Sequence, residues 1–321
     1  MIFAEMSLDE AEGAVLAYKV EAGKTSLRKG TLLTRDHIAA LRQAGVAQVL
    51  AARFEPGDIG EDAAAEALGT MLATNTISLS PPAAGRINLF ASAKGIFRVD
   101  HASVDAINAH DARISLATIH NHSRVESGQM IATIKIIPFA IPQSLLDEVP
   151  LLLGQSRALE VLPFQPLRIG LIQSRLPSIR ESVLDKTRAL METRILRNGG
   201  KLVAENRVLH DVQALGQTIA ELETLCDMIV IFSASAVTDI ADILPRAIMQ
   251  AGGDILRIGV PVDPGNLLVL GKYRNKYIIA APGSARSQRE NSLDWILDRL
   301  MAGIALDQNA LSHMGVGGLL L

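Results

Sequence analysis

The residues best suited to bind a small ligand stand in polar loops that each follow an apolar run, at residues 174–182, 233–239 and 282–287. These loops are rich in serine, alanine and glycine, whose small side chains let backbone N–H groups approach a ligand closely. Where such loops lead into helices, the aligned peptide dipoles also favour a phosphate group. The loops therefore indicate a site for a small anionic molecule.

Charged side chains in and beside these loops extend the possible chemistry. Arg286 offers a forked set of donors for a phosphate or carboxylate. Asp185, Asp239 and Asp242 could hold a magnesium ion or position a nucleophile on a phosphate. Asp239 and Asp242 could instead only stabilise the start of a helix, and a serine-rich loop before a helix is often no more than a cap. Both interpretations stay open at this point.

The apolar runs alternate with amphipathic segments in the C-terminal half. Strands are predicted at residues 167–173, 201–206, 228–232, 254–259, 267–270 and 277–281, and helices at 185–197, 212–225, 242–251 and 291–302. Strand–helix alternation with short links predicts an α/β fold, a mostly parallel sheet with helices on both faces. The loops at the carboxyl ends of parallel strands meet at one edge of the sheet, so we expect the polar loops to form one pocket.

The N-terminal half has a different pattern. Helices are predicted at residues 9–17, 35–44 and 62–73, a strand at 46–51, antiparallel strands within 86–99 and 114–135, and a tight turn at 125–130. Several prolines then punctuate a connection at residues 145–162. We therefore expect an α+β domain with antiparallel strands at 1–162, an α/β domain at 163–305, and a tail at 306–321 that links or docks to a partner.

Composition restricts the class of protein. A chain of 321 residues, 49% hydrophobic, predicts two packed domains. The net charge of −3 and the 3% aromatic content argue against nucleic acid as a partner. The sole cysteine, Cys226, excludes a cysteine metal cage, and no metal ligand is assigned. The acidic N-terminus and short apolar runs argue against a signal peptide and a membrane span, so we expect a cytoplasmic protein.

Several segments resemble a known domain. PLRIGLIQSRLPSIRESVLDKT, FSASAVTDIADILPRAI, IGVPVDPGNLLVLG and APGSARSQRENSLDWILDRLMAG resemble the molybdopterin-binding (MoCF-type) domain of molybdenum-cofactor biosynthesis proteins. They look most like a bacterial subgroup in which this domain often precedes a cytidylyltransferase-like domain. GTLLTRDHIAALRQAGVAQV resembles the segment before the domain in molybdenum-insertion proteins.

The resemblance implies a site for molybdopterin, or another form of the molybdenum cofactor, at the polar loops. It places Asp185, Asp239 and Asp242 at acidic positions of the family's pocket, as candidate catalytic residues. The candidate cofactor-binding residues are Ser174, Ser233, Ala234, Ser235, Asp263, Pro264, Gly265, Pro282, Gly283, Ser284 and Arg286. One position departs from the family, which has glycine where this chain has Ser233-Ala234. A β-carbon there could deny the close approach that a phosphate needs, which favours a binding protein over an adenylylating enzyme.

The resemblance thus implies binding of molybdopterin or a molybdenum-cofactor intermediate during cofactor biosynthesis. If the protein is catalytic, it is a transferase that uses Mg²⁺ and a nucleotide for phosphoryl or nucleotidyl transfer, or that inserts molybdenum. Two alternatives stay open: a non-catalytic carrier or scaffold, and a nucleotide hydrolase of the competence-damage type. The expected partners are a cytidylyltransferase or a molybdoenzyme, and related domains imply a homo-oligomer.

Overall fold

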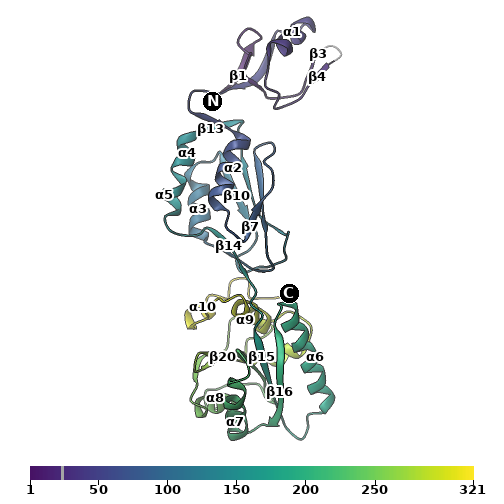
Figure 1. The fold of residues 1–321 in the computed structure, drawn as a ribbon, viewed down its shortest axis with the longest axis vertical. Coiled ribbons are helices and arrows are strands. Elements are labelled where there is room, and N and C mark those ends of the chain that lie inside the picture. Colours follow the sequence, from purple (N-terminus) through teal and green to yellow (C-terminus); the bar gives the residue numbers. More distant parts are fainter. Residues whose placement is uncertain (23–24) are drawn as a thin grey trace. The chain divides into compact units, whose positions relative to one another are not determined.

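The computed structural model describes residues 1–22 and 25–321, which divide into two compact units, Met1–Val161 and Leu162–Leu321 (Figure 1). The N-terminal unit is built of short elements and antiparallel strand pairs, and the C-terminal unit of longer strands and helices in alternation. The predicted fold class is confirmed: an α/β unit with a mostly parallel sheet and an α+β unit with antiparallel strands.

The first part of the N-terminal unit packs one helix on a small sheet. Its elements are β1 (Ile2–Ser7), β2 (Val15–Leu16), β3 (Val20–Ala22), β4 (Thr25–Leu27), α1 (Arg35–Gln43) and β5 (Gln48–Arg53). The sheet has the order β1-β5-β2, and Leu16, Leu33 and Leu41 are buried in its core. The side chain of Thr34 caps α1, as the sequence predicts.

The helix predicted at residues 9–17 is wrong. The chain forms hydrogen-bonded turns between Ser7 and Ala14, and Gly13 has a positive φ of 79°. Val15 and Leu16 then pair with Ala52 and Ala51 of β5. The alanine-rich segment satisfies its backbone groups in these turns and in β2, because pairing with a distant strand overrides its local helix propensity.

The second part of the N-terminal unit surrounds its own apolar core, which includes Leu68, Leu89 and Phe97. Its elements are β6 (Asp58–Gly60), α2 (Glu61–Leu72), β7 (Ile77–Leu79), β8 (Arg86–Ala91), β9 (Gly95–Val99), α3 (His101–His110), β10 (Ile114–Thr118), β11 (Arg124–Val125), β12 (Met130–Ile136), β13 (Ala140–Pro142), α4 (Gln143–Asp147), α5 (Val149–Leu153) and β14 (Leu159–Pro163). The turn predicted at residues 125–130 is present, but it joins β11 and β12, which belong to different sheets.

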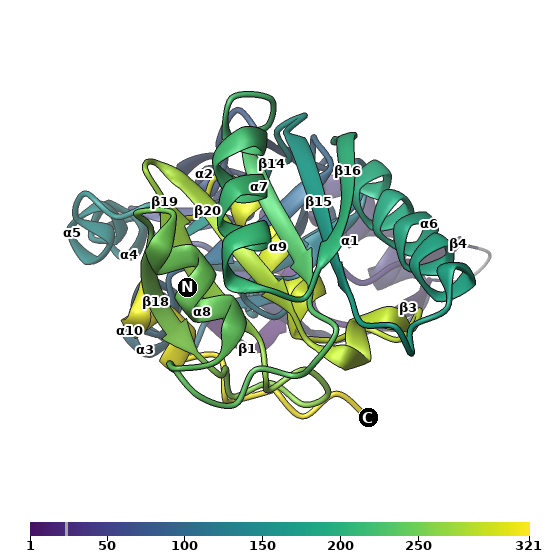
Figure 2. The same cartoon turned by 90° about the horizontal axis from the view of Figure 1, so that it is seen from below.

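The C-terminal unit, in which every residue is described, has a single six-stranded sheet in the order β16-β15-β17-β20-β19-β18 (Figure 2). Its elements are β15 (Arg168–Arg175), α6 (Glu181–Arg197), β16 (Lys201–Leu209), α7 (Val212–Glu223), β17 (Met228–Phe232), α8 (Ile243–Gln250), β18 (Asp254–Ile258), β19 (Val269–Tyr273), β20 (Lys276–Ala281), the 3₁₀-helix η1 (Gly283–Arg286), α9 (Ser292–Met301) and α10 (Gln308–Ser312). Strands β16, β15, β17 and β20 are parallel, whereas β19 and β18 continue the sheet in antiparallel fashion.

Alternate side chains of the central strands enter two cores. On one face Val230 and Phe232 of β17 pack with α6 and α9, and on the other face Ile229 and Ile231 pack with α7 and α8 (Figure 2). This double burial explains why the strands are continuous apolar runs. The turn from α6 to β16 favours glycine at position 200, because a β-carbon there would lie 2.9 Å from Cγ2 of Ile195 and 3.0 Å from the backbone oxygen of Leu167.

No helix among the described residues is both long enough and apolar enough to cross a lipid bilayer.

Candidate functional site

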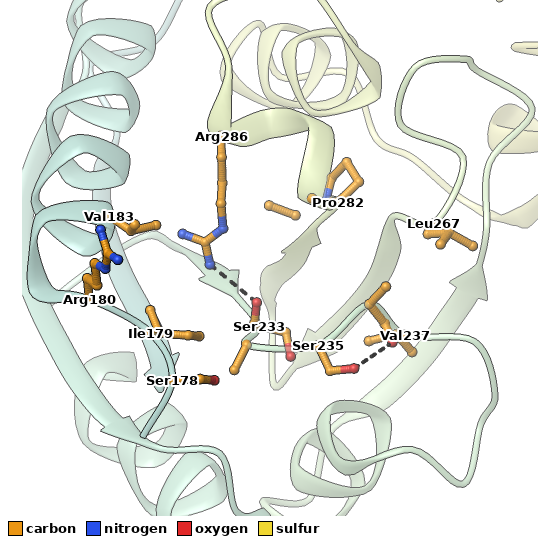
Figure 3. A pocket seen from close by; sticks show the side chains of 14 residues that line it. Ser178, Ile179, Arg180, Val183, Ser233, Ser235, Val237, Leu267, Pro282 and Arg286 are labelled. Carbon is orange, nitrogen blue, oxygen red and sulfur yellow. Dashed lines mark hydrogen bonds between the residues drawn. The ribbon is translucent and has the colours of Figure 1, made fainter. Parts of the chain in front are cut away.

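A cavity of about 520 Å³ opens at the carboxyl ends of β15, β17 and β20 (Figure 3). The residues that line it are Ser178, Ile179, Arg180, Val183, Ser233, Ala234, Ser235, Ala236, Val237, Leu267, Ala281, Pro282, Gly283 and Arg286. The three polar loops after these strands thus meet at one edge of the sheet, because the strands that precede them are parallel neighbours. In size the cavity suits a small organic ligand, for which sites are roughly 300–1,000 Å³.

Arg286 is the central cation of this cavity. It reaches from η1 toward the loop after β17, where its Nη2 donates to the carbonyl oxygen of Ser233 at 3.3 Å (Figure 3). Its Nη1 donates to Oγ1 of Thr187 on α6 at 2.6 Å, and its guanidinium lies 5.1 Å from the ring centroid of Phe232. The side chain is therefore held in place by neutral groups.

The charge of Arg286 has no matching carboxylate among the described residues, and burial lowers the pKa of its guanidinium. An arginine remains protonated at neutral pH despite such a shift. A partly buried cation without a counter-charge has a high free energy, which a bound anion would lower. The cavity therefore has the electrostatic character of an anion site.

The loop after β17 is held by a hydrogen bond to the neighbouring strand β15. Ser174, at the end of β15, is fully buried, and its Oγ accepts a hydrogen bond from the backbone N–H of Ala234 at 2.8 Å. The same Oγ lies 3.0 Å from Nδ1 of His210. Ser174 thus supports the loop and does not line the cavity, whereas Ser233, Ala234 and Ser235 do line it. Neither Ser233 nor Ala234 has a positive φ, so the β-carbons at these positions impose no backbone strain.

The three aspartates with a predicted catalytic role have partners outside the cavity. Asp185 is exposed and accepts from Nη2 of Arg207 at 2.6 Å. Asp239 accepts from the N–H of Ala241, and Asp242 caps α8 by accepting from the N–H of Ile243, both at 2.7 Å. None of the three lines the cavity in this structure. Their catalytic role stays a prediction.

The lining residues do not fit a magnesium ion. Mg²⁺ is bound through carboxylate and phosphate oxygens, and the fourteen lining residues include no aspartate, glutamate or histidine. Elsewhere in the described chain, no group of three histidine, cysteine or acidic side chains is close enough to hold a metal ion. The lining of the cavity therefore offers Mg²⁺ no carboxylate or imidazole ligand.

The loop with Asp263, Pro264 and Gly265 lies beside the cavity and has a supporting position. The backbone of Asp263 pairs with Gly318 and Leu320 of the C-terminal segment through hydrogen bonds of 2.8 Å. The carbonyl oxygen of Gly265 accepts from Oγ of Ser292 at 2.6 Å, and Gly265 has a φ of 120° that favours glycine. This loop anchors the start of α9.

Of the other predicted binding residues, Pro282, Gly283 and Arg286 line the cavity, and Ser284 does not. The hydroxyl oxygens of Ser233 and Ser284 are buried and have no hydrogen-bond partner among the described residues. Ser233 thus lines the cavity, but its hydroxyl oxygen is buried and unpartnered within the described part of the chain.

One wall of the cavity is formed by Ile179, Arg180 and Val183. The predicted loop at residues 174–182 contains the first two, but none of the three is among the predicted binding residues. These residues stand at the start of α6, which begins at Glu181, one turn earlier than predicted. Leu267, on the opposite side of the cavity, was also missed (Figure 3). The sequence does contain a signal for this wall. The loop at residues 174–182 is expected at the same sheet edge, so an apolar side chain in it such as Ile179 could face the ligand.

Residues 5–53 match the family model of a domain of unknown function (DUF8806). No curated protein matches the chain.

Among solved structures, the chain is similar to the protein CinA, of unknown function, from Thermoplasma acidophilum, with 12% identity and a TM-score of 0.34 over 43% of this chain and 98% of that one. It is also similar to the molybdopterin biosynthesis MoeA protein from Pyrococcus horikosii, with 11% identity and a TM-score of 0.30 over 97% of this chain and 75% of that one. A third is the molybdopterin biosynthesis enzyme MoaB from Thermus thermophilus, with 16% identity and a TM-score of 0.32 over 43% of this chain and 97% of that one. At these TM-scores the likenesses assign neither a family nor an activity to the chain.

Proposed function

We propose that the cavity of the C-terminal unit binds molybdopterin, or an intermediate of the molybdenum cofactor, by its phosphate group. The observation that carries this proposal is Arg286, a partly buried cation that faces the cavity without a carboxylate partner among the described residues. A phosphate accepts from an arginine fork in two parallel hydrogen bonds. Arg286 uses Nη1 and Nη2 for one contact each, so it has further N–H groups for a ligand.

The remaining walls suit a flat heterocycle. Ile179, Val183, Val237 and Leu267 supply apolar surface, and Ser235 supplies a hydroxyl group. Pockets of this kind, mostly apolar with a few polar groups, orient a ring and select its substituents. The resemblance of the VDPGNLL and PGSARS segments to MoCF-type domains supports a pterin as the bound heterocycle.

Binding and presentation of the pterin is the role that the lining favours. Group transfer on a phosphate requires positive charge at the transferred group and an oriented nucleophile or base. Arg286 and Arg180 supply charge, but the lining holds no general base, and Asp185, Asp239 and Asp242 have other partners. We therefore propose a cytoplasmic carrier that passes the pterin to a cytidylyltransferase or a molybdoenzyme, and that acts as a homo-oligomer.

The test is a titration of the full chain with molybdopterin and with its dephosphorylated form. We expect the phosphorylated pterin to bind more tightly, and Arg286→Met to weaken its binding by about 10- to 100-fold, as the loss of a charge-assisted hydrogen-bond set implies. Arg289→Met is the matched control, because Arg289 is an exposed arginine outside the lining that donates to the Leu320 carbonyl. Equal affinity of the wild type and Arg286→Met would refute the anchor.

A second arm separates the carrier from the catalytic alternatives. The pterin-loaded protein is incubated with ATP and Mg²⁺, and products are separated by chromatography. The carrier predicts no adenylylated pterin. Formation of such a product, and its loss in Asp242→Asn, would instead identify a transferase. Nucleotide hydrolysis without any pterin binding would support the competence-damage type of hydrolase.

A further inference from the structure

The loop that carries Arg286 is held by a second arginine. Arg194 of α6 is 5% exposed, and each of its nitrogen positions has a partner. Its Nη1 donates to the carbonyl oxygen of Ala285 and its Nη2 to that of Ser287, both at 2.7 Å. Its Nε donates to Oδ1 of Asp294 on α9 at 3.1 Å. Arg194 thus forms hydrogen bonds to the backbone on both sides of Arg286.

The same face of α6 also holds the other end of Arg286. Thr187 stands seven residues before Arg194, which places both on one side of the helix, two turns apart. Thr187 accepts from Nη1 of Arg286, and its own hydroxyl donates to the carbonyl oxygen of Val183 at 2.8 Å. Helix α6 therefore holds both the backbone on either side of Arg286 and its guanidinium group.

The short 3₁₀-helix η1 has no side-chain cap of its own. Its geometry is weaker than that of an α-helix, and a segment of this length does not hold itself in one conformation. External donors to the Ala285 and Ser287 carbonyls supply the missing constraint. A binding group performs well only when the residues around it keep it within a fraction of an ångström of its working position.

We infer that Arg194 is a positioning residue that sets the orientation of Arg286 in the cavity, an inference that rests on the proposed anion binding there. Asp294 in turn holds Arg194. Its Oδ1 accepts from Nε of Arg194, and its Oδ2 accepts from the N–H of Asn291 at 3.1 Å. Arg194 is outside the lining of the cavity. Its effect on binding acts through Arg286 alone.

Arg197 provides a matched control. It stands one turn further along α6, and its Nη2 donates to the same Asp294 Oδ1 at 2.8 Å and to Asp298 Oδ1 at 3.2 Å. It has no hydrogen bond to the loop at residues 283–287 among those described. Loss of Arg197 should disturb the ion-pair network as loss of Arg194 does, but leave Arg286 in place.

The experiment measures binding of inorganic phosphate to the full chain by calorimetry, with thermal unfolding as the readout of stability. Arg194→Lys keeps the charge but cannot reach three acceptors, so we expect phosphate binding to weaken about 10-fold. Arg197→Lys should lower the melting temperature comparably and change phosphate binding less than about 2-fold. In an Arg286→Met background, Arg194→Lys should cause no further loss, since the two residues act in series.

Each outcome separates this inference from the proposed function. If Arg286→Met loses phosphate binding while folded Arg194→Lys and Arg194→Gln bind it as the wild type does, the positioning role is refuted and the anchor stands. If Arg194→Lys and Arg286→Met weaken binding additively, Arg194 does not act through Arg286 and the inference fails. If the wild type and Arg286→Met bind phosphate equally, or neither binds it, the anion site itself is refuted.

Discussion

Two regions of the C-terminal unit contain buried or partly buried arginines, and they differ in whether a carboxylate balances the charge. Between α6 and α9, Arg194 and Arg197 face Asp294, whose side chain is 2% exposed, so each cation has a carboxylate partner. In the cavity, Arg286 contacts Thr187, which precedes Arg194 by two turns of α6. Arg286 has a hydroxyl, a carbonyl and an aromatic ring around it but no carboxylate among the described residues. The first region is electrostatically complete without a ligand, and the second is not.

The largest effect is expected from Asp294→Ala. This change leaves the buried Arg194 without its carboxylate partner, leaves Arg197 with Asp298 alone, and removes the capping-box hydrogen bond from the N–H of Asn291. Removing one partner of a buried ion pair costs about 3–5 kcal/mol of unfolding free energy. Urea denaturation measures it. Glu221→Ala, at an exposed carboxylate on α7, is the control and should change stability by less than about 0.5 kcal/mol. Equal effects of the two changes would show that the α6–α9 network is not a stabilising core.

A smaller loss is expected from Ser174→Ala, which tests how the cavity loop is held. The change leaves the N–H of Ala234 without its acceptor. An unsatisfied buried donor costs about 1–3 kcal/mol. We expect that loss in chemical denaturation, with Ser182→Ala at an exposed serine of α6 as a neutral control. Wild-type stability of Ser174→Ala would mean that the loop after β17 needs no support from β15.

Arg286→Met should change the stability of the ligand-free protein by less than about 1 kcal/mol, because replacing a buried charge that lacks a counter-charge by an apolar group of similar size is often neutral or stabilising. The measurement is the melting temperature of ligand-free Arg286→Met, compared with that of ligand-free Arg194→Met. Arg194→Met should be clearly less stable than the wild type. If both changes destabilise the protein equally, the two regions do not differ in the way described.

The smallest effect is expected at an ion pair near the surface of the N-terminal unit. Arg113 donates from Nε and Nη2 to the two carboxylate oxygens of Asp111, both at 2.8 Å, and lowers the pKa of Asp111 to about 2. The stabilisation is present above the ordinary carboxyl pKa near 3.8 and is lost as the pH falls through about 2.

Solvent reduces the strength of this pair, because the Arg113 side chain is 45% exposed, and less than about 1 kcal/mol is expected. Carboxyl NMR titration should show the pKa of Asp111 return toward 3.8 in Arg113→Gln. Arg86→Gln, at an exposed arginine of β8, should leave it unchanged. A wild-type pKa near 3.8 would contradict the prediction.

Much of the C-terminal unit could be predicted from sequence because its signals are local. The apolar run of β17 and the helix α7, which Asp211 caps, match their predicted positions to within two residues. The meeting of the polar loops at one edge followed from strand–helix alternation, and Ser233, Pro282 and Arg286 do line one cavity. The helix predicted at residues 9–17 is absent for the converse reason, since Val15 and Leu16 pair with the distant strand β5 and the residues before them form turns.

The sequence by itself determined the layered α/β architecture, the edge at which the cavity lies and the presence of an arginine in it. Only the tertiary structure decided which loop residues face the cavity, and that Ser174 supports the loop from behind. It also decided that Asp294, one hundred residues from Arg194 in the chain, compensates that arginine, while Arg286 has no such partner among the described residues. Periodicity records which face of an element is buried, but the pairing of charges depends on which distant elements pack together, and no local pattern contains that information.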